Sequence, residues 1–274
     1  MGSSHSRATI RGVESLILKL VVTPALIGAA SLAGRRWGAA VGGWLVGIPF
    51  TSAPIALFLA LDHGAAFAAS ASVGMLLGTI SQAIFCLAYS FSASRGVPWL
   101  ASFGSGCVGF AASTVVLQVL SVPLMPAFLA TLLALVVVLF LVPRTPEKSD
   151  KSGSPATLPR WDIPARMVVA TVFVVLLTAV APVLGPYLSG LLSPFPLFGA
   201  VLVVFVHRSE GATSVMKLLR GLLFGLFAPA GFFMALSALI EPVGIGLGFA
   251  AATATALVVQ GFTLLMLRPE TLSG

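Results

Sequence analysis

Long stretches without charge follow one another along almost the whole chain. A helix needs about 20 apolar residues to cross the hydrocarbon core of a bilayer, which is about 30 Å thick. Uncharged or nearly uncharged runs of about this size occur at 16–33, 38–61, 67–91, 97–119, 122–142, 165–183, 186–206, 213–239 and 243–266. These runs predict an all-α integral membrane protein with about nine transmembrane helices.

The composition also favours hydrocarbon as the solvent. Only 8% of the residues are charged, whereas a soluble domain normally carries about 25% to keep its surface hydrated. The net charge of +7 could suggest nucleic acid, but the basic residues sit at the ends of apolar runs, where they report membrane orientation. We therefore expect the lipid bilayer, and no nucleic acid, as a partner. Cys86 and Cys107 fall inside apolar runs and are expected to be packing residues.

One hydrophilic segment, residues 144–162, divides the chain and is expected to be a flexible linker because of its Pro, Ser, Lys and Asp content. Five helices are predicted within residues 1–143 and four within residues 163–274. If the N-terminal tail is counted as loop zero, the odd-numbered loops between the predicted helices, together with the C-terminus, hold twelve Lys and Arg residues. The N-terminal tail and the first turn of the first helix hold the other three. Because basic loops stay in the cytoplasm, the linker and the C-terminus are expected there and the N-terminus outside.

Self-similarity at a constant offset of 147 residues is the most informative pattern. Ten residues between positions 38 and 78 are identical to those 147 positions later, namely Gly38, Gly43, Pro49, Ala53, Phe58, Gly64, Ala65, Gly74, Leu76 and Gly78. Upstream, Lys19, Val21 and Val22 fall on Arg166, Val168 and Val169. The first apolar run could otherwise be a signal peptide, but this counterpart in the second half favours a transmembrane helix.

The offset spans five predicted crossings, which is an odd number, so the second copy is expected to be inverted relative to the first. Inverted-topology repeats recur in secondary transporters, because two equivalent halves can exchange conformations and so alternate access. A secondary transporter or permease for a small solute is therefore the leading hypothesis. The alternative at this point is a duplicated membrane protein that transports nothing.

Corresponding helices interrupted by Gly or Pro indicate where a solute could bind near the bilayer midplane. A proline removes one backbone donor and leaves the carbonyl about four residues earlier without its helical partner. The residues expected to form such a site are Gly47, Pro49, Thr51, Ser52, Ser193, Pro194, Pro196 and Gly199. Proline also occurs in membrane helices merely as a kink, and that interpretation stays open.

Two matching Gly-x-x-x-Gly pairs are expected to serve helix packing, because small residues let two backbones approach closely. The first pair is Gly74 and Gly78, and its copy is Gly221 and Gly225. We expect the helices predicted at 67–91 and 213–239 to pack on these faces.

Ionisable residues gather at the ends of the predicted helices, so a buried carboxylate proton relay is not expected. Arg208, Lys217 and Arg220 are candidates for binding an anion or a lipid headgroup. A lipid-modifying enzyme, a third hypothesis, would need a polar cluster at a membrane interface, for which His207, Glu210, Lys217 and Arg220 are the candidates. The sequence holds no motif for metal, cofactor or catalysis, so we predict none of them and expect the protein not to be an enzyme.

The stretch from Tyr187 to about Met266 carries a Tyr, a Gly-Leu pair, Phe-Pro in mid-helix, a His, and a Glu followed by Gly. In these features it resembles the GlpM-type family of small inner-membrane proteins. The first half resembles a more divergent copy, which keeps Gly47, Pro49 and Asp62-His63-Gly64. The resemblance implies a bacterial inner-membrane protein. It also leaves open a non-transporting accessory or scaffold role in envelope or polysaccharide assembly, and a homodimer is a further expectation.

Overall fold

The chain is a bundle of α-helices. The computed structural model describes residues 20–21, 24–25, 44, 49, 52–143 and 162–272, and within them no strand occurs. The helices are α3 (Ser52–His63), α4 (Ala65–Ser94), α5 (Trp99–Leu117), α6 (Leu124–Leu141), α7 (Asp162–Leu192), α8 (Leu197–Gly225) and α9 (Phe227–Leu272). The all-α prediction is therefore confirmed for the described residues. Most of the first predicted helix, the first part of the second and most of the linker lie outside them.

Five helical stretches among the described residues are long and apolar enough to cross a membrane. They are Ala65–Ser94, Trp99–Leu117, Leu124–Leu141, Met167–Leu192 and Gly199–Leu265. Large apolar side chains such as Val108 on α5 and Phe140 on α6 are exposed, 68% and 76% respectively. Such exposed apolar faces are what a lipid solvent accepts, and these helices are those of a multi-pass membrane protein.

Single glycines separate helical segments at several points. Gly64 lies between α3 and α4 with φ 91° and ψ 171°. Gly211 interrupts α8 with φ 83° and ψ −175°. A residue with a Cβ atom avoids this backbone region, so glycine is required at both positions. Gly185 in α7 and Gly244 in α9 have the same kind of backbone conformation.

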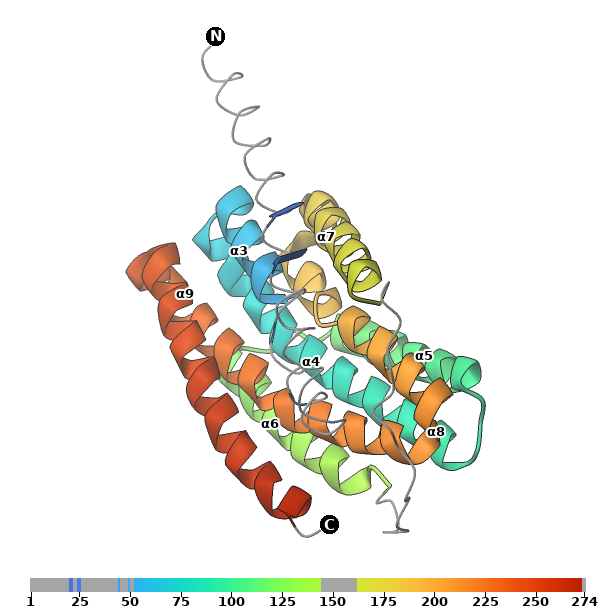
Figure 1. Cartoon of the computed structure of the whole chain (residues 1–274). Helices are drawn as coiled ribbons and strands as arrows, with labels where there is room; N and C mark the ends of the chain where they lie inside the picture. The colour runs from blue at the N-terminus through green and yellow to red at the C-terminus, as the bar shows by residue number, and fades with distance from the viewer. Residues whose placement is uncertain are drawn as a thin grey trace, which may run out of the picture.

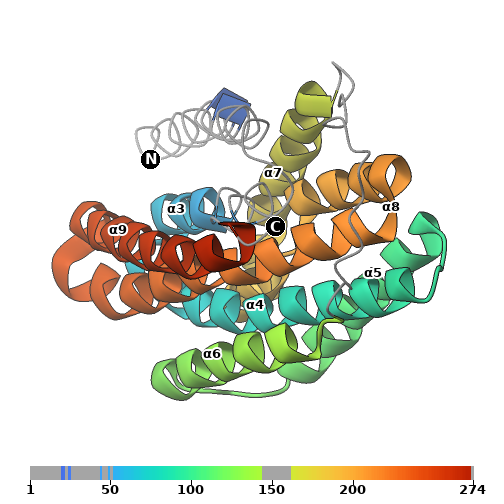
Figure 2. The same cartoon turned by 60° about the horizontal axis from the view of Figure 1, so that its bottom comes forward.

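The bend at Gly244 folds α9 into two antiparallel parts, which run side by side in Figures 1 and 2. Gly231 in the first part faces Thr255 and Val259 in the second, and Gly248 lies against the backbone of Ile240. These contacts show that the segments before and after Gly244 pack directly on each other. The run predicted at 213–239 is itself divided, because α8 ends at Gly225 and α9 begins at Phe227.

Helix α4 lies at the centre of the bundle, with α5, α6, α7, α8 and α9 around it (Figure 1). Its most apolar stretch is 67% buried, against 22% for α5 and for α6. Hydroxyl groups tie the outer helices to it. Thr131 of α6 donates a hydrogen bond to the Leu76 carbonyl at 2.9 Å, and Ser237 of α9 donates one to the Ala69 carbonyl at 3.0 Å. Hydroxyls also join α4 to α5, where the hydroxyl oxygens of Ser92 and Ser105 lie 2.8 Å apart and Thr114 donates to Ser81 at 3.1 Å, and buried apolar side chains fill much of the remaining contact area.

The bundle has two distinct ends. We call the end reached by the C-terminus of α4, the α4–α5 loop and the bend of α8 the linker end. It lies at the lower right of Figure 1, and α6 also finishes on this side. The opposite end, at the upper left, holds the turn between α3 and α4 and the bend of α9. Asp62 and Glu241 lie beside these last two turns, whereas Arg95 and Arg208 lie beside the linker-end turns.

Two stretches that are 147 residues apart share the same local structure. The amide of Ala53 donates to the Pro49 carbonyl at 2.9 Å, and the amide of Ala200 donates to the Pro196 carbonyl at 2.6 Å. Each helix that starts in this way stops 15 residues after its proline, at Gly64 or Gly211. The two helices run in opposite directions, because the Gly64 turn lies at the opposite end and the Gly211 bend at the linker end (Figure 1).

Candidate functional site

The chain breaks between α7 and α8, at the residues predicted to bind solute in the second half. Helix α7 ends at Leu192 and α8 begins at Leu197. Pro194 and Pro196 should leave the Gly190 and Leu192 carbonyls without helical partners. Instead, tight turns supply the donors: the Ser193 amide lies 3.2 Å from the Gly190 carbonyl, and the Phe195 amide lies 3.1 Å from the Leu192 carbonyl. These two carbonyls therefore do not need a solute, an ion or water as a partner.

Two hydroxyl groups beside the break are buried and unpartnered. Ser189 and Ser193 are both 0% exposed, and neither Oγ has a hydrogen-bond partner among the described residues. Several buried hydroxyls of α4 donate to the carbonyl four residues earlier, as Ser72 does to Ala68 and Thr79 to Met75, whereas Ser90 of α4 also has no partner among the described residues. An unpartnered buried hydroxyl destabilises a protein by roughly 1–3 kcal/mol.

Local geometry explains why Ser189 differs from the other hydroxyls. Its carbonyl partner four residues earlier would be Gly185, whose backbone is not helical. Ser193 occupies the turn that follows α7, where its own amide is divided between the Ser189 and Gly190 carbonyls, each at 3.2 Å. The sequence identified Ser193 as a polar residue beside two prolines inside the helix predicted at 186–206. It gave no sign of Ser189, because the effect of Gly185 appears only in the backbone conformation.

The break packs tightly against α4 through glycine. A Cβ atom on Gly190 would overlap the Ala71 carbonyl, and one on Gly74 would overlap the Tyr187 carbonyl. A Cβ on Gly78 would lie 2.5 Å from the Leu191 carbonyl oxygen and 2.9 Å from the Pro194 ring. Backbones this close exchange Cα–H···O contacts, which recur where glycines meet in membrane helices. Gly74 and Gly78 therefore face the end of α7.

Aromatic rings close the space beside the break. The Phe195 ring makes edge-to-face contacts with Phe110 at 5.1 Å and with Phe85 at 6.4 Å between centroids. Pro194, Pro196 and Gly199 are buried. The described half of the predicted site is thus packed with apolar groups around two unpartnered hydroxyls. In the first half, Pro49 is buried and Ser52 begins α3 at 6% exposure, while Gly47 and Thr51 lie outside the described residues.

A second feature with polar character is a pocket of about 550 Å³ at the linker end. The α4–α5 loop and the bend of α8 form its walls. The lining residues are Ala93, Gly96, Val97, Pro98, Trp99, His207, Arg208, Gly211 and Ala212. The guanidinium carbon of Arg208 lies 5.3 Å from the centroid of the Trp99 ring. The hydroxyl of Tyr89, a residue with no exposed surface, lies 2.9 Å from Nδ1 of His207.

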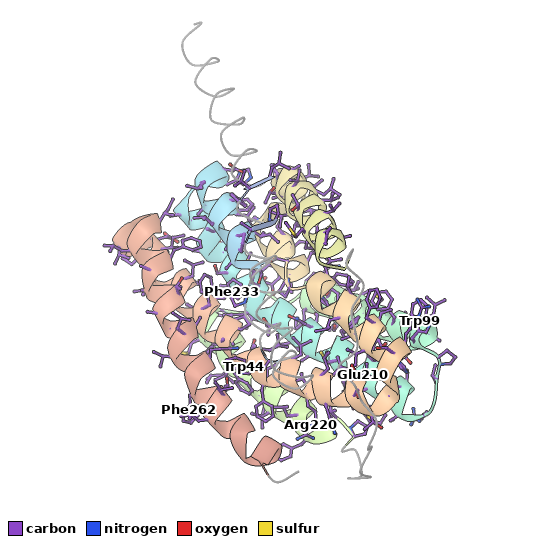
Figure 3. All side chains as sticks on the ribbon, viewed as in Figure 1. Trp44, Trp99, Glu210, Arg220, Phe233 and Phe262 are labelled. Carbon is purple, nitrogen blue, oxygen red and sulfur yellow. The ribbon has the colours of Figure 1, made fainter. Side chains whose placement is uncertain are left out.

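The remaining predicted polar residues do not join this pocket. Glu210 and Lys217 are exposed and Arg220 is partly buried on α8, and none of the three lines the pocket. Figure 3 shows Trp99 and Glu210 toward the linker end, with Phe233 inside the bundle and Phe262 on its outer edge. The sequence singled out Arg208 but missed Tyr89 and Trp99. Their only sequence signal is a polar atom or large ring at the end of an apolar run.

Metal chemistry gains no support from the described residues, because no three His, Cys, Asp or Glu side chains in them come together as a metal site would require. Elsewhere, the side-chain amide of Gln260 donates a hydrogen bond from Nε2 to the Trp44 backbone carbonyl at 3.1 Å, and the Trp44 indole N–H donates to the Thr263 hydroxyl at 3.0 Å. These bonds join α9 to a residue of the first half and are structural.

Comparison with protein-family models, with curated proteins and with solved structures finds no match to this chain.

Proposed function

We propose that the protein is a secondary transporter or permease for a small solute, built from two inverted repeats with five and four transmembrane helices. The observation that carries this proposal is the pair of helices that begin at Pro49 and Pro196 and stop at Gly64 and Gly211. Their first hydrogen bonds and their terminal glycines match, while their directions in the bundle are opposite (Figure 1). Equivalent halves of opposite orientation are the construction that allows alternating access.

The glycine contacts between α4 and α7 support the same architecture. Gly74 of the first copy packs on Gly190 of the second, and these residues correspond by the 147-residue offset to Gly221 and Gly43. The duplication therefore predicts an equivalent close approach between Gly221 and Gly43, the latter outside the described residues. Two symmetric glycine contacts of this kind would let the copies slide on each other, which a transporter of this design requires.

The substrate class follows from the chemistry beside the break. Ser189 and Ser193 each offer a donor and an acceptor, and the described residues named around the break are otherwise apolar or backbone groups. An ion would be left without a counter-charge there, which is strongly unfavourable in a low-dielectric interior. A small uncharged solute with hydroxyl or amide groups fits best. Because Ser189 and Ser193 are fully buried here, binding of that solute would require the packing around the break to open.

We further propose that the linker end faces the cytoplasm of a bacterial inner membrane and that the N-terminus lies outside. Arg95, Arg208, Lys217 and Arg220 lie in the linker-end half of the described bundle, while Asp62 and Glu241 lie at the opposite end. Lys and Arg are favoured on the cytoplasmic side of membrane proteins. The GlpM-type resemblance agrees with this location.

The alternative is a non-transporting accessory or scaffold protein of the inner membrane. The contacts of Pro194 with Gly78 and of Phe195 with Phe85 and Phe110 favour it, because these described residues pack closely beside the break. The two proposals differ in whether Ser193 ever becomes accessible from water.

Cysteine labelling separates them. With Cys86 and Cys107 replaced, Ser193→Cys in membrane vesicles should react with a small membrane-impermeant reagent applied from either side, at rates that a transported solute changes. The matched control is Ser90→Cys, another fully buried hydroxyl without a partner among the described residues, which should stay unreactive. A Ser193→Cys protein that is folded but inert from both sides would rule out transport through this site.

The inverted architecture has its own test. Asp62→Cys and Ser209→Cys sit two residues before Gly64 and Gly211. They should be labelled from opposite sides of the membrane, Ser209→Cys from the cytoplasm. Labelling of both from one side would refute the inverted repeat.

A further inference from the structure

The pocket at the linker end has a fixed cation on one wall. The Arg208 side chain is exposed and its guanidinium lies over the Trp99 ring. An aromatic face holds a guanidinium by its charge and leaves the N–H groups on the guanidinium edge free to donate. Arg208 is thereby held at the rim of the pocket with its donor groups still available for a planar or tetrahedral anion.

The neighbouring residue adds a second donor. Nδ1 of His207 is bonded to the hydroxyl of Tyr89, whose burial makes an unused O–H unfavourable. The Tyr89 O–H therefore donates to Nδ1, and in the neutral imidazole the proton then resides on Nε2. A protonated imidazole would carry a proton on Nε2 as well. In both forms the edge of His207 away from Tyr89 is a donor, and His207 lines the pocket.

Two helix N-termini add partial positive charge to the same space. Helix α5 begins at Trp99 and has no side-chain cap, and the second segment of α8 begins at Ala212, after Gly211. The first amides of a helix lack internal partners and favour anions. The C-terminus of α4 also lies here, and two of its last carbonyls already accept hydrogen bonds, Ser92 from the amide of Val97 and Ala93 from that of Gly96.

We propose that this pocket binds an oxyanion, specifically a phosphate group held by Arg208 and His207. The proposal does not depend on transport, because the pocket is formed by the α4–α5 loop and the α8 bend and not by the break at Pro194 and Pro196. Phosphate is available here from two sources: the headgroup of an anionic lipid, or a soluble phosphate. Exposed Leu100, at 63%, follows Trp99 and would face the acyl chains of a bound lipid.

The test measures thermal unfolding of the full-length protein in a neutral detergent during titration with three probes. These are dioctanoyl phosphatidylglycerol, dioctanoylglycerol as its phosphate-free match, and inorganic phosphate at constant ionic strength. A ligand that binds the folded state raises the melting temperature in a saturable way. We expect saturable stabilisation by phosphatidylglycerol and none by dioctanoylglycerol. If inorganic phosphate acts too, the site takes soluble phosphate; if it does not, the ligand is a lipid headgroup.

Two variants assign the effect to the pocket. Arg208→Gln should raise the apparent dissociation constant roughly 10- to 100-fold, because it removes charge-assisted hydrogen bonds. Trp99→Leu keeps the charge of Arg208 but removes the aromatic ring against which its guanidinium packs, and should raise the apparent dissociation constant about two- to fivefold. The matched control is Arg95→Gln, because Arg95 is also exposed and lies 5.4 Å from the Phe91 ring centroid, yet does not line the pocket.

The control variant should bind like the wild type. The proposal is overturned if neither phosphate-bearing probe stabilises the wild type in a saturable way. It is equally overturned if Arg95→Gln weakens binding as much as Arg208→Gln, because the effect would then be the general attraction of a basic surface.

Discussion

The hydroxyl of Tyr89 lies 2.9 Å from Nδ1 of His207, joining α4 to α8 across 118 residues of sequence. The two rings are also in contact, with their centroids 5.7 Å apart. Through this bond the most buried helix of the described bundle fixes the ring orientation of a residue that lines the linker-end pocket. A change in the packing around Tyr89 should therefore also change the orientation of His207 in the pocket.

Replacing Tyr89 by Phe should keep the ring and remove the bond. We expect the free energy of unfolding to fall by about 1 kcal/mol, the usual net value of one hydrogen bond. The His207 imidazole should also change from one tautomer to a mixture, because its Nδ1 loses its fixed donor. Nitrogen-15 chemical shifts of His207 measure this. The matched control is Tyr187→Phe, which removes bonds to the Leu117 carbonyl at the end of α5 and to the Leu120 carbonyl and should leave His207 unchanged.

Replacing Gly190 by Ala should separate α7 from α4. The added Cβ would overlap the Ala71 carbonyl, and backbone cannot yield as a flexible side chain can. We expect a loss of about 1–3 kcal/mol, as is usual for overpacking, measured as thermal stability in detergent. Gly104→Ala is the control, because nothing lies within 4 Å of a Cβ there. It should be neutral or stabilise α5 by about 0.5–1 kcal/mol. Equal behaviour of the two variants would contradict the close contact.

Replacing Gly64 or Gly211 by Ala tests the backbone alone. No atom lies within 4 Å of a Cβ at either position, so the loss should be torsional, roughly 1–3 kcal/mol for each variant. Similar losses are expected because the two φ angles are 91° and 83°. Gly246→Ala has equally open surroundings and no unusual φ, and should not destabilise. A loss at Gly64 without one at Gly211 would argue against their equivalence.

Replacing Ser189 and Ser193 by Ala should not destabilise the empty protein. Removing a hydroxyl that has no partner relieves a desolvation penalty, so we expect no change or a gain of up to about 1 kcal/mol per site. Thr131→Val is the comparison, because its hydroxyl bonds the Leu76 and Ala127 carbonyls, and it should lower stability by about 1 kcal/mol. A clear loss in the serine variants would mean that their hydroxyls are already satisfied in the membrane.

Sequence reasoning predicted the helical class and the presence of long apolar helices, because both depend on composition and run length; the number of nine crossings stays a prediction. It also paired Gly64 with Gly211 by the offset of 147 residues, and both glycines have a positive φ angle; the repeat itself stays a prediction. It assigned Gly74 and Gly78 to helix packing on the small-residue spacing, but the neighbour they meet is the end of α7. Spacing along one helix specifies a face and leaves the partner undefined, so contacts such as Gly74 with Gly190 could not be derived.

The polar details were harder to predict for a related reason. The turn at residues 193–196 satisfies the carbonyls that its prolines were expected to release, and such compensation depends on local dihedral angles. Tyr89, Trp99 and His207 lie on different elements, and no periodicity relates them. The sequence could mark Arg208 as a cation near a helix end, but not the ring beneath it.

The glycine bends concentrate any change of direction in α7, α8 and α9 at single residues. Because glycine can adopt backbone angles that other residues avoid, rotation about its φ and ψ bonds changes the angle between the two segments while both stay helical. The segment that begins at Leu197 can therefore tilt relative to the segment that begins at Ala212 without the loss of hydrogen bonds inside either one.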